Sequence, residues 1–370
     1  MKRLDRLVYV ELVGPWIFGV AIFTSLVFAT TLLMRMSEWV VRGVEPATIL
    51  TLAALLTPGI MVKTFAMALL LASLLAFGRL SNDSEIVALR AAGASLHRIM
   101  QPVLVFSLSV AVLAFALNET VVPWASQQAI AMQIEIEKQL SESRRTKPVF
   151  HAVYTGGRLA ALVTAKDFNL SKGALSGVHI VAYERDGEPS LVMLADQLVY
   201  NGPQDWRIVG AARMISVQQP LWVSISDGAW PPEVARPDFT PKNLLAGFAQ
   251  DLDVLSMSET WAAIQDKRKD RFADPRQIAN LEFGFYNKIA LPLAAVIFAL
   301  LGAPLGIRNH RTGVGAGFAL SVLVSFLYLT IVNFLAVYSK NGAIPPWMAS
   351  FAPLIIGIVA ATIAIARKNG

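Results

Sequence analysis

Residues 78–98, GRLSNDSEIVALRAAGASLHR, form a short polar segment between two long apolar runs, and the rest of the chain is arranged around it. Asn82 or Asp83 can cap a short helix here and Gly93 can end it, because these residue types favour those positions. Arg90, near the end of this helix, has the sign that the helix dipole favours. A helix this short is marginal in water, so it needs a neighbour, either the membrane surface or another protein.

The composition is that of a membrane protein with a substantial part outside the bilayer. Of the 370 residues, 55% are hydrophobic and only 16% are charged, whereas a soluble domain carries about 25% charged residues. The net charge of +6 is scattered along the chain without aromatic interleaving, which argues against a nucleic-acid partner. Cysteine is absent and the four histidines are far apart, so we expect no disulfide, metal site or cofactor in this chain.

Six apolar runs are long enough to cross a bilayer as helices. They cover residues 7–34, 47–77, 99–122, 278–307, 313–338 and 345–366. The first run is longer than the 7–15 apolar residues of a cleaved signal peptide, so we expect it to remain as a span. The sequence therefore predicts an α-helical integral membrane protein.

The region between the third and fourth runs has a different character. It contains nearly equal numbers of acidic and basic residues, and turn signals such as Gly156-Gly157 and Asp186-Gly187 divide it into candidate strands. These strands cover residues 149–154, 158–168, 177–185, 190–200, 206–217 and 221–226. Helical composition precedes them at 125–143, and Ser256 with Glu259 forms a capping-box pattern that predicts a helix to about residue 271. We expect a sandwich or barrel-like β domain with flanking helices.

Charge counting orients the spans, because loops rich in Lys and Arg stay in the cytoplasm. One set of ends carries Lys2, Arg3, Arg6, Arg79, Arg90, Arg98, Arg308, Arg311, Arg367 and Lys368. The other set carries Arg35, Arg42 and Lys340, partly offset by Glu38 and Glu45. Both termini and the segment 78–98 are then cytoplasmic, and the β domain is outside. The chain divides into a membrane half at 1–123, a β domain at 124–276 and a second membrane half at 277–370.

The short cytoplasmic helix, at about residues 79–97, has two possible roles. It can rest on lipid headgroups, or it can insert into a cytosolic partner and transmit motion to the spans. A helix that lies on lipid prefers Lys and bulky apolar residues, whereas this one is rich in Ala and poor in Lys. The composition therefore favours contact with a protein.

At this point the residues resemble the coupling segment of the lipopolysaccharide-export ABC transporter permeases, the LptF/LptG (YjgP/YjgQ) family. The positions that match its pattern are Gly78, Leu80, Ser84, Glu85, Ala92 and Gly93. The likeness extends over the whole chain, through the six spans, the β insert, Pro58 in the second span and GAIPPW at 342–347. The resemblance implies a periplasmic β-jellyroll between the third and fourth spans of an inner-membrane protein.

The resemblance also implies partners and site residues. The partners are a cytosolic ABC ATPase dimer, a second homologous permease, a periplasmic jellyroll bridge protein, lipopolysaccharide and membrane lipid. ATP and Mg²⁺ are bound by the ATPase, since this chain contains no GxxxxGK[ST] motif. The ATPase contact is expected at Ser84, Glu85, Ala88, Leu89 and Gly93. Spans one and five of two such permeases form the lateral opening in this family.

Three basic residues are candidates for contact with an anionic lipid. Arg35 and Arg42 follow the first span on the outer side, where charge counting disfavours cations, and they can form charge-assisted hydrogen bonds with lipid phosphates. Anchoring at the interface beside Glu38 and Glu45 is the alternative. Lys63 lies inside the second span, where a charge is costly. It can contact a headgroup or extend outward from a long helix.

Two other function classes remain open from the residues alone. A membrane enzyme that acts on lipid headgroups requires clustered titratable groups, and a secondary transporter requires intramembrane acids or inverted repeats. The sequence shows neither pattern clearly. It also does not distinguish which of the two permeases this chain is.

Overall fold

The computed structural model describes most of the chain. The described residues are 2–41, 43–143, 149–155, 158–169, 173–184, 187–202, 205–217, 222–225, 230–231, 234, 255–269, 275–307 and 314–369. Within these ranges, the side chains of some residues, Arg35 among them, lie outside the description.

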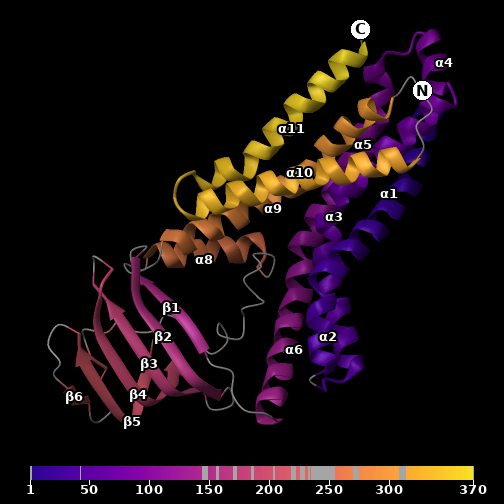
Figure 1. Cartoon of the computed structure of the whole chain (residues 1–370). Helices are drawn as coiled ribbons and strands as arrows, with labels where there is room; N and C mark the ends of the chain where they lie inside the picture. The colour runs from indigo at the N-terminus through magenta and orange to yellow at the C-terminus, as the bar shows by residue number, and fades with distance from the viewer. Residues whose placement is uncertain are drawn as a thin grey trace.

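Helices make up both ends of the chain, and a sheet lies between them in sequence (Figure 1). The helices are α1 (Lys2–Thr31), α2 (Leu33–Val41), α3 (Pro46–Asn82), α4 (Glu85–Ala91), α5 (Leu96–Glu119), α6 (Val121–Ser143), α8 (Met257–Lys269), α9 (Pro275–Gly306), α10 (Val314–Lys340) and α11 (Pro346–Asn369). Six described stretches are long and apolar enough to cross a membrane, in α1, α3, α5 with the start of α6, α9, α10 and α11. The six predicted spans are confirmed.

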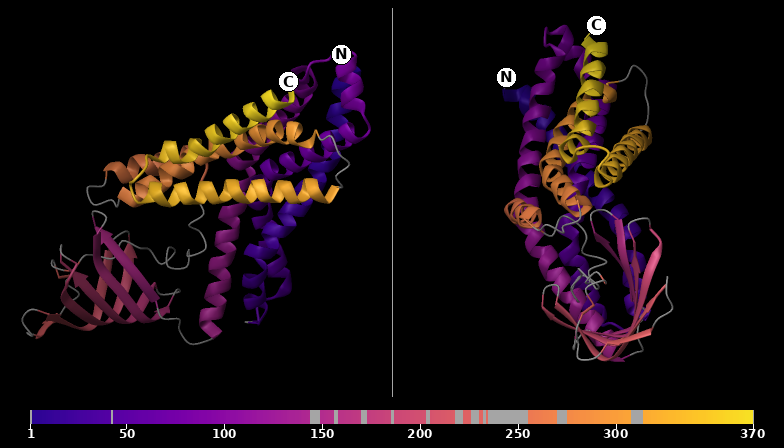
Figure 2. Two further views of the ribbon diagram at one scale, coloured as in Figure 1. Left: turned by 45° about the horizontal axis from the view of Figure 1, so that its top comes forward. Right: turned by 90° about the vertical axis from the view of Figure 1, so that its left-hand side faces the viewer.

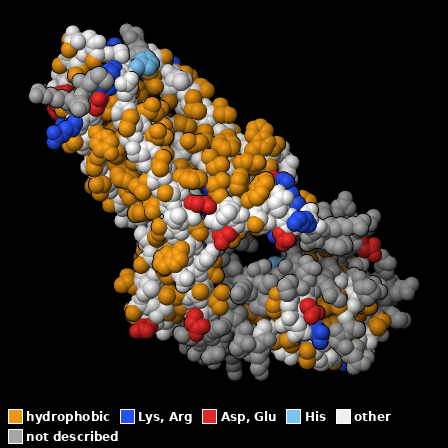
Figure 3. Space-filling view, turned by 180° about the vertical axis from the view of Figure 1, so that it is seen from behind, with side chains coloured by type: hydrophobic (Ala, Val, Ile, Leu, Met, Phe, Trp, Pro, Cys, Tyr) orange, Lys and Arg blue, Asp and Glu red, His pale blue; other side chains and the backbone are white. Residues whose placement is uncertain are grey.

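The bundle has two distinct ends. Both termini and α4 lie together at one end, which we call the α4 end, and the sheet lies beyond the other, the sheet end (Figure 1). Figure 3 shows a broad apolar surface on the bundle, with charged side chains toward its borders. α3 has 37 residues, or about 56 Å of helix at 1.5 Å per residue, which exceeds the roughly 30 Å hydrocarbon core of a bilayer. This helix therefore extends beyond the membrane.

α3 forms the centre of the bundle and packs closely against α9. A Cβ atom at Gly302 would lie 2.8 Å from the Leu70 carbonyl oxygen, and one at Gly306 would lie 2.8 Å from the Leu74 carbonyl oxygen. Two glycines that lie four residues apart on one face of a helix let its backbone approach that of a neighbouring helix. This Gly-x-x-x-Gly contact in α9 was not among the features predicted from sequence.

α1 packs along α3 through smaller contacts. A Cβ atom at Gly19 would lie 3.0 Å from the Ala68 Cα atom, and the Thr24 and Thr64 hydroxyls are hydrogen bonded at 3.0 Å. Phe23 stacks on Phe318 of α10 with 6.2 Å between ring centroids. α1 and α10 therefore touch each other as well as the central helix.

The sheet contains six antiparallel strands in sequential order, as an up-and-down meander. The strands are β1 (Val149–Thr155), β2 (Arg158–Asn169), β3 (Ala174–Tyr183), β4 (Pro189–Gly202), β5 (Asp205–Ser216) and β6 (Trp222–Ile225). The sheet is curved and stands off the end of the bundle (Figure 2). The predicted β insert is confirmed, and within the described residues its strands follow one another without a crossover.

Alternating residues supply the core of the sheet. Val163, Ile180 and Met193 on neighbouring strands are fully buried on one face, together with Trp206. His179, one residue before Ile180, is exposed on the opposite face, as the two-residue period of a strand requires. α6 brings the chain to this domain, and α8 precedes its return to the bundle (Figure 1).

Candidate functional site

α4 is shorter than predicted and begins at a different residue. α3 continues to Asn82, so that Arg79 belongs to its last turn, and the Asp83 N–H still donates to the Arg79 carbonyl oxygen. The chain then reverses at Ser84, whose φ of 61° is left-handed and unusual for a residue other than glycine. The prediction of a cap at Asn82 or Asp83 is therefore wrong, because the helix of the second span uses both residues to complete its own end.

The end of α4 is the one predicted. Gly93 has a φ of +88°, a conformation that glycine adopts without steric cost. Its N–H donates to the Arg90 carbonyl oxygen, and the Ala94 N–H donates to the Leu89 carbonyl oxygen, each at 3.0 Å. These two bonds form a Schellman motif, which ends the helix and turns the chain into α5.

α4 has one face in the core and one face exposed. Ile86 is 2% exposed and belongs to the main apolar cluster, against which Leu89 also packs. Val87 is 65% exposed, and Ser84, Ala88 and Gly93 are exposed as well, whereas Glu85 is half-buried. Of the five predicted coupling residues, three therefore lie open, Glu85 lies at the edge and Leu89 faces the bundle.

Hydrogen bonds connect α4 to the end of the chain. Arg90 donates from Nη1 to the Lys368 carbonyl oxygen at 3.3 Å. Lys368 in turn donates from Nζ to the Ile307 carbonyl oxygen at 2.7 Å, where a cation near the end of α9 also suits the helix dipole. These contacts join α4 to α11 and α11 to α9.

Ion pairs connect both flanks of α4 to α1. Arg79 Nη2 lies 2.6 Å from Glu11 Oε1. Arg98 Nη1 lies 2.8 Å from Asp5 Oδ1, and Arg98 Nη2 donates to Asp5 Oδ2 at 3.0 Å. Arg79 precedes α4 and Arg98 follows it. The residues on each flank of α4 therefore form an ion pair with the first turns of α1. The sequence identified both arginines only as positive charges at the cytoplasmic ends of the spans, and not their partners.

Comparison with known protein families assigns the chain to one of them. The sequence profile described as "Lipopolysaccharide export system permease LptF/LptG" matches residues 6–367, nearly the whole chain. The chain belongs to the LptF/LptG family. No curated protein matches it. The family assignment makes this chain a permease subunit of a lipopolysaccharide export system, a transporter component rather than an enzyme.

Two of the three basic residues predicted to contact lipid, Arg35 and Lys63, do not lie near α4 in the permease. Arg35 belongs to α2, which lies at the opposite end of α1 from α4 (Figure 1). Lys63 is exposed on α3, between buried Val62 and Thr64. Arg42 and the side chain of Arg35 lie outside the described residues. The role of all three residues in lipid binding stays a prediction.

A buried lysine marks the meeting point of α5, α8 and α9 in the permease. Lys288 is 4% exposed, and its Nζ donates to the Asn118 carbonyl oxygen at 3.4 Å. The adjacent Glu119 carboxylate accepts the Met257 N–H, at 3.0 and 2.9 Å to its two oxygens, at the first residue of α8. Lys288 and Glu119 therefore join these three helices to one another.

The start of α8 also carries the predicted capping box. The Ser256 N–H donates to Glu259 Oε2 at 2.8 Å, and the Glu259 N–H donates to Ser256 Oγ at 3.2 Å. The hydrogen bond from the Ser256 backbone, followed by that from its hydroxyl, lowers the pKa of Glu259 below the ordinary value of 4.5. The capping-box prediction is confirmed.

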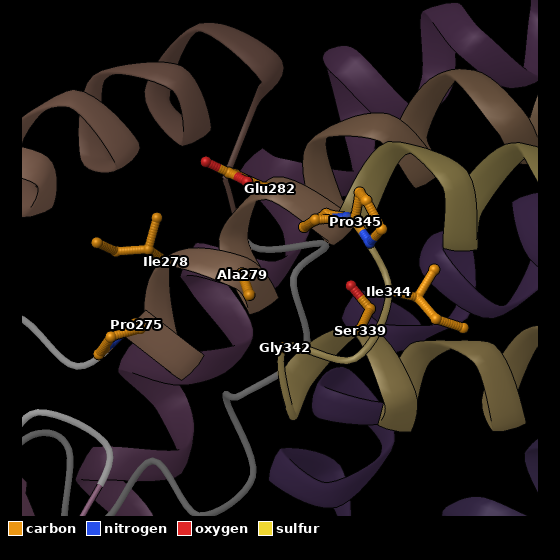
Figure 4. Close-up of a pocket in the computed structure, with 9 residues that line it drawn as sticks. Pro275, Ile278, Ala279, Glu282, Ser339, Gly342, Ile344 and Pro345 are labelled. Carbon is orange, nitrogen blue, oxygen red and sulfur yellow. The ribbon is translucent and has the colours of Figure 1, made fainter.

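A shallow hollow lies where α9 begins and the α10–α11 turn passes (Figure 4). Its volume is about 330 Å³, and prolines and aliphatic side chains line most of it. Glu282 at its edge is paired with Arg268. Among the described residues of the permease, no group of side chains could hold a metal ion, and the hollow offers no arrangement of groups for chemistry.

Proposed function

We propose that this permease is one half of the membrane part of a lipopolysaccharide exporter, and that a separate cytosolic ATPase drives it through α4. The observation that carries the proposal is the two-sided character of α4. Ile86 fixes the helix in the bundle core, while Ala88 and its exposed neighbours present small side chains to the outside. A helix with one buried and one exposed face can bind a partner on the exposed face and transmit its movement to the bundle through the buried face.

The α4 end is cytoplasmic in this proposal. The positive-inside rule supports it, because Arg79, Arg90 and Arg98 gather at the same end as the two chain termini (Figure 1). The curved sheet is then periplasmic and receives the lipid. Its edge strands, β1 and β6 in the described sheet, are suited to strand addition by a periplasmic bridge protein of similar β structure.

A second, homologous permease completes the membrane part. α1 and α10 support this proposal, because only 17% and 11% of the residues in their most apolar stretches are buried in the single chain. The lipid would leave the membrane through an opening lined by these helices in both permeases. Arg35, Arg42 and Lys63 are proposed to hold its anionic headgroup, as basic groups attract phosphates.

The test replaces the exposed face of α4 in the whole complex. Ala88→Trp adds bulk to that face, and Glu85→Ala removes the carboxylate at its edge. We expect both variants to lose ATP-driven export of lipopolysaccharide, and Ala88→Trp to stop the ATPase from co-purifying with the permease. Ala47→Trp is the control, since Ala47 is exposed in the first turn of α3 at the sheet end. Normal ATPase binding and export in both α4 variants would refute the proposal.

A further inference from the structure

α1 joins the main apolar cluster of the bundle near the α4 end. Its fully buried apolar side chains there are Val8 and Leu12, each 0% exposed. Farther along, Phe23 is buried in a smaller cluster with α3 and α10, whereas Ile17 is 58% exposed and Leu26 is 50% exposed. Because Val8 and Leu12 pack in the main cluster beside α4, a force applied at α4 can reach α1 through its first turns.

Two carboxylates lie on these same turns, and each meets an arginine from a different helix. Glu11 pairs with Arg79 in the last turn of α3, and Asp5 pairs with Arg98 in the first turn of α5. These turns are the ones that enter and leave α4. α1 is thus attached by charge to both flanks of the helix that is proposed to receive the ATPase.

We propose that Asp5 and Glu11 are positioning residues that make α1 follow α4 during the transport cycle, a role that rests on the proposed function. Apolar packing at Val8 and Leu12 has no directional preference, so it permits α1 to slide or rotate against its neighbours. Ion pairs with hydrogen-bond geometry, in contrast, do have a directional preference. Asp5 and Glu11 are about 9 Å apart along the helix axis at 1.5 Å per residue, and their partners stand on two helices, so the two pairs fix both the height and the rotation of α1.

These ion pairs are too exposed to matter much for folding. Arg79 is 55% exposed and its partner Glu11 is 20% exposed, while Asp5 is 40% exposed and its partner Arg98 is 25% exposed. Ion pairs that solvent reaches on at least one side contribute little to stability. Removing them should therefore leave a folded permease in which α1 no longer follows α4. This separates a positioning role from a structural one.

The experiment uses charge exchange in the complete complex with its ATPase and second permease, reconstituted in lipid vesicles with lipopolysaccharide. Asp5→Arg and Arg98→Asp are tested singly and together, and Glu11→Arg with Arg79→Glu forms a second set. Asp5→Asn and Glu11→Gln are neutral replacements in case a reversed charge impairs folding. Arg268→Asp is the matched control, because Arg268 forms an ion pair with Glu282 far from α4.

We expect each single exchange to keep ATPase binding and ATP hydrolysis but to lower lipid release about fivefold or more, within the usual range of coupling between sites. The double exchanges should restore release, and Arg268→Asp should leave it unchanged. Normal release in the single and neutral variants, or no recovery in the doubles, would overturn the proposal. A native complex that hydrolyses ATP without releasing lipid would instead refute the proposed function.

Discussion

α3 and α1 lie side by side, yet the bundle encloses them very differently. In the most apolar stretch of α3, 78% of the residues are buried, against 17% in α1 and 11% in α10. α3 meets α9 at glycines that bring the backbones together, whereas α1 meets the bundle through one glycine, one hydroxyl pair, one ring contact to α3 and a few buried side chains. The same apolar composition thus produces one helix that is largely enclosed and one that is mostly exposed in the single chain.

The difference indicates which parts of the permease can move. Close-packed interiors resist deformation, so α3 and α9 are suited to remain fixed while a transporter changes shape. Helices with fewer buried residues can shift at lower cost, and α1 and α10 have the smallest buried shares of the six apolar stretches. The link between α4 and α1 is then important because it joins the proposed site of force to a helix that is free to respond.

The largest effect is expected from filling the contact between α3 and α9. In Gly302→Val, the Cβ atom alone would lie 2.8 Å from the Leu70 carbonyl oxygen. The two helices must therefore separate to make room for the valine side chain. We expect a loss of about 3 kcal/mol or more in the free energy of unfolding, the upper part of the overpacking range, measured by thermal unfolding in detergent. Gly315→Val is the control, because no atom lies within 4 Å of its Cβ position. Equal stability of the two variants would show that α3 and α9 are not a fixed pair.

A smaller effect is expected where α1 meets α3. Gly19→Val crowds the Ala68 backbone at 3.0 Å, but α1 can move outward because little else encloses it. We predict a stability loss of about 1 kcal/mol, at the low end of overpacking costs, and weaker cross-linking between cysteines placed in α1 and α3. Gly14→Val, with nothing within 4 Å of its Cβ position, is the matched control. A loss as large as that of Gly302→Val would contradict the contrast between the two helices.

The smallest effect concerns the start of α8. Because the pKa of Glu259 is lowered in the folded chain, its contribution to stability is complete above the ordinary value of 4.5 and is lost as the pH falls through the lowered pKa. Glu259→Gln should remove this pH dependence, and Ser256→Ala should cost about 1 kcal/mol, as loss of a helix cap typically does. Protease cleavage near α8, followed between pH 3 and 7 in native and variant permease, measures both. An unchanged pH profile in Glu259→Gln would exclude Glu259 as the titrating group.

Features set by neighbouring residues were predictable from the sequence. The six spans, the six strands, the capping box at Ser256 and the helix end at Gly93 all depend on local composition or on residues a few positions apart. β3 is the strand with the largest boundary error, since its first residues from Ala174 resemble the preceding turn.

Features set by distant residues were not predictable. Nothing near Arg79 or Arg98 in the sequence identifies Glu11 or Asp5 as the partner, because the ion pairs form only once α1 lies between α3 and α5. The same holds for Lys288, which packing buries at the junction of three helices. The short length of α4 also depends on packing, because α3 continues through Asn82 and is capped by Asp83, the two residues that were expected to cap the new helix.

The central claim is that α1 follows α4, and one distance tests it directly. The chain has no cysteine, so spin labels can be placed at Ser25→Cys in α1 and Leu323→Cys in α10, both exposed positions. The distance between the labels is measured in the complete complex with and without bound ATP. The account predicts a distance change on ATP binding in the native background and none when Asp5→Asn and Glu11→Gln are combined. An equal change in both backgrounds, or no change in either, would contradict it.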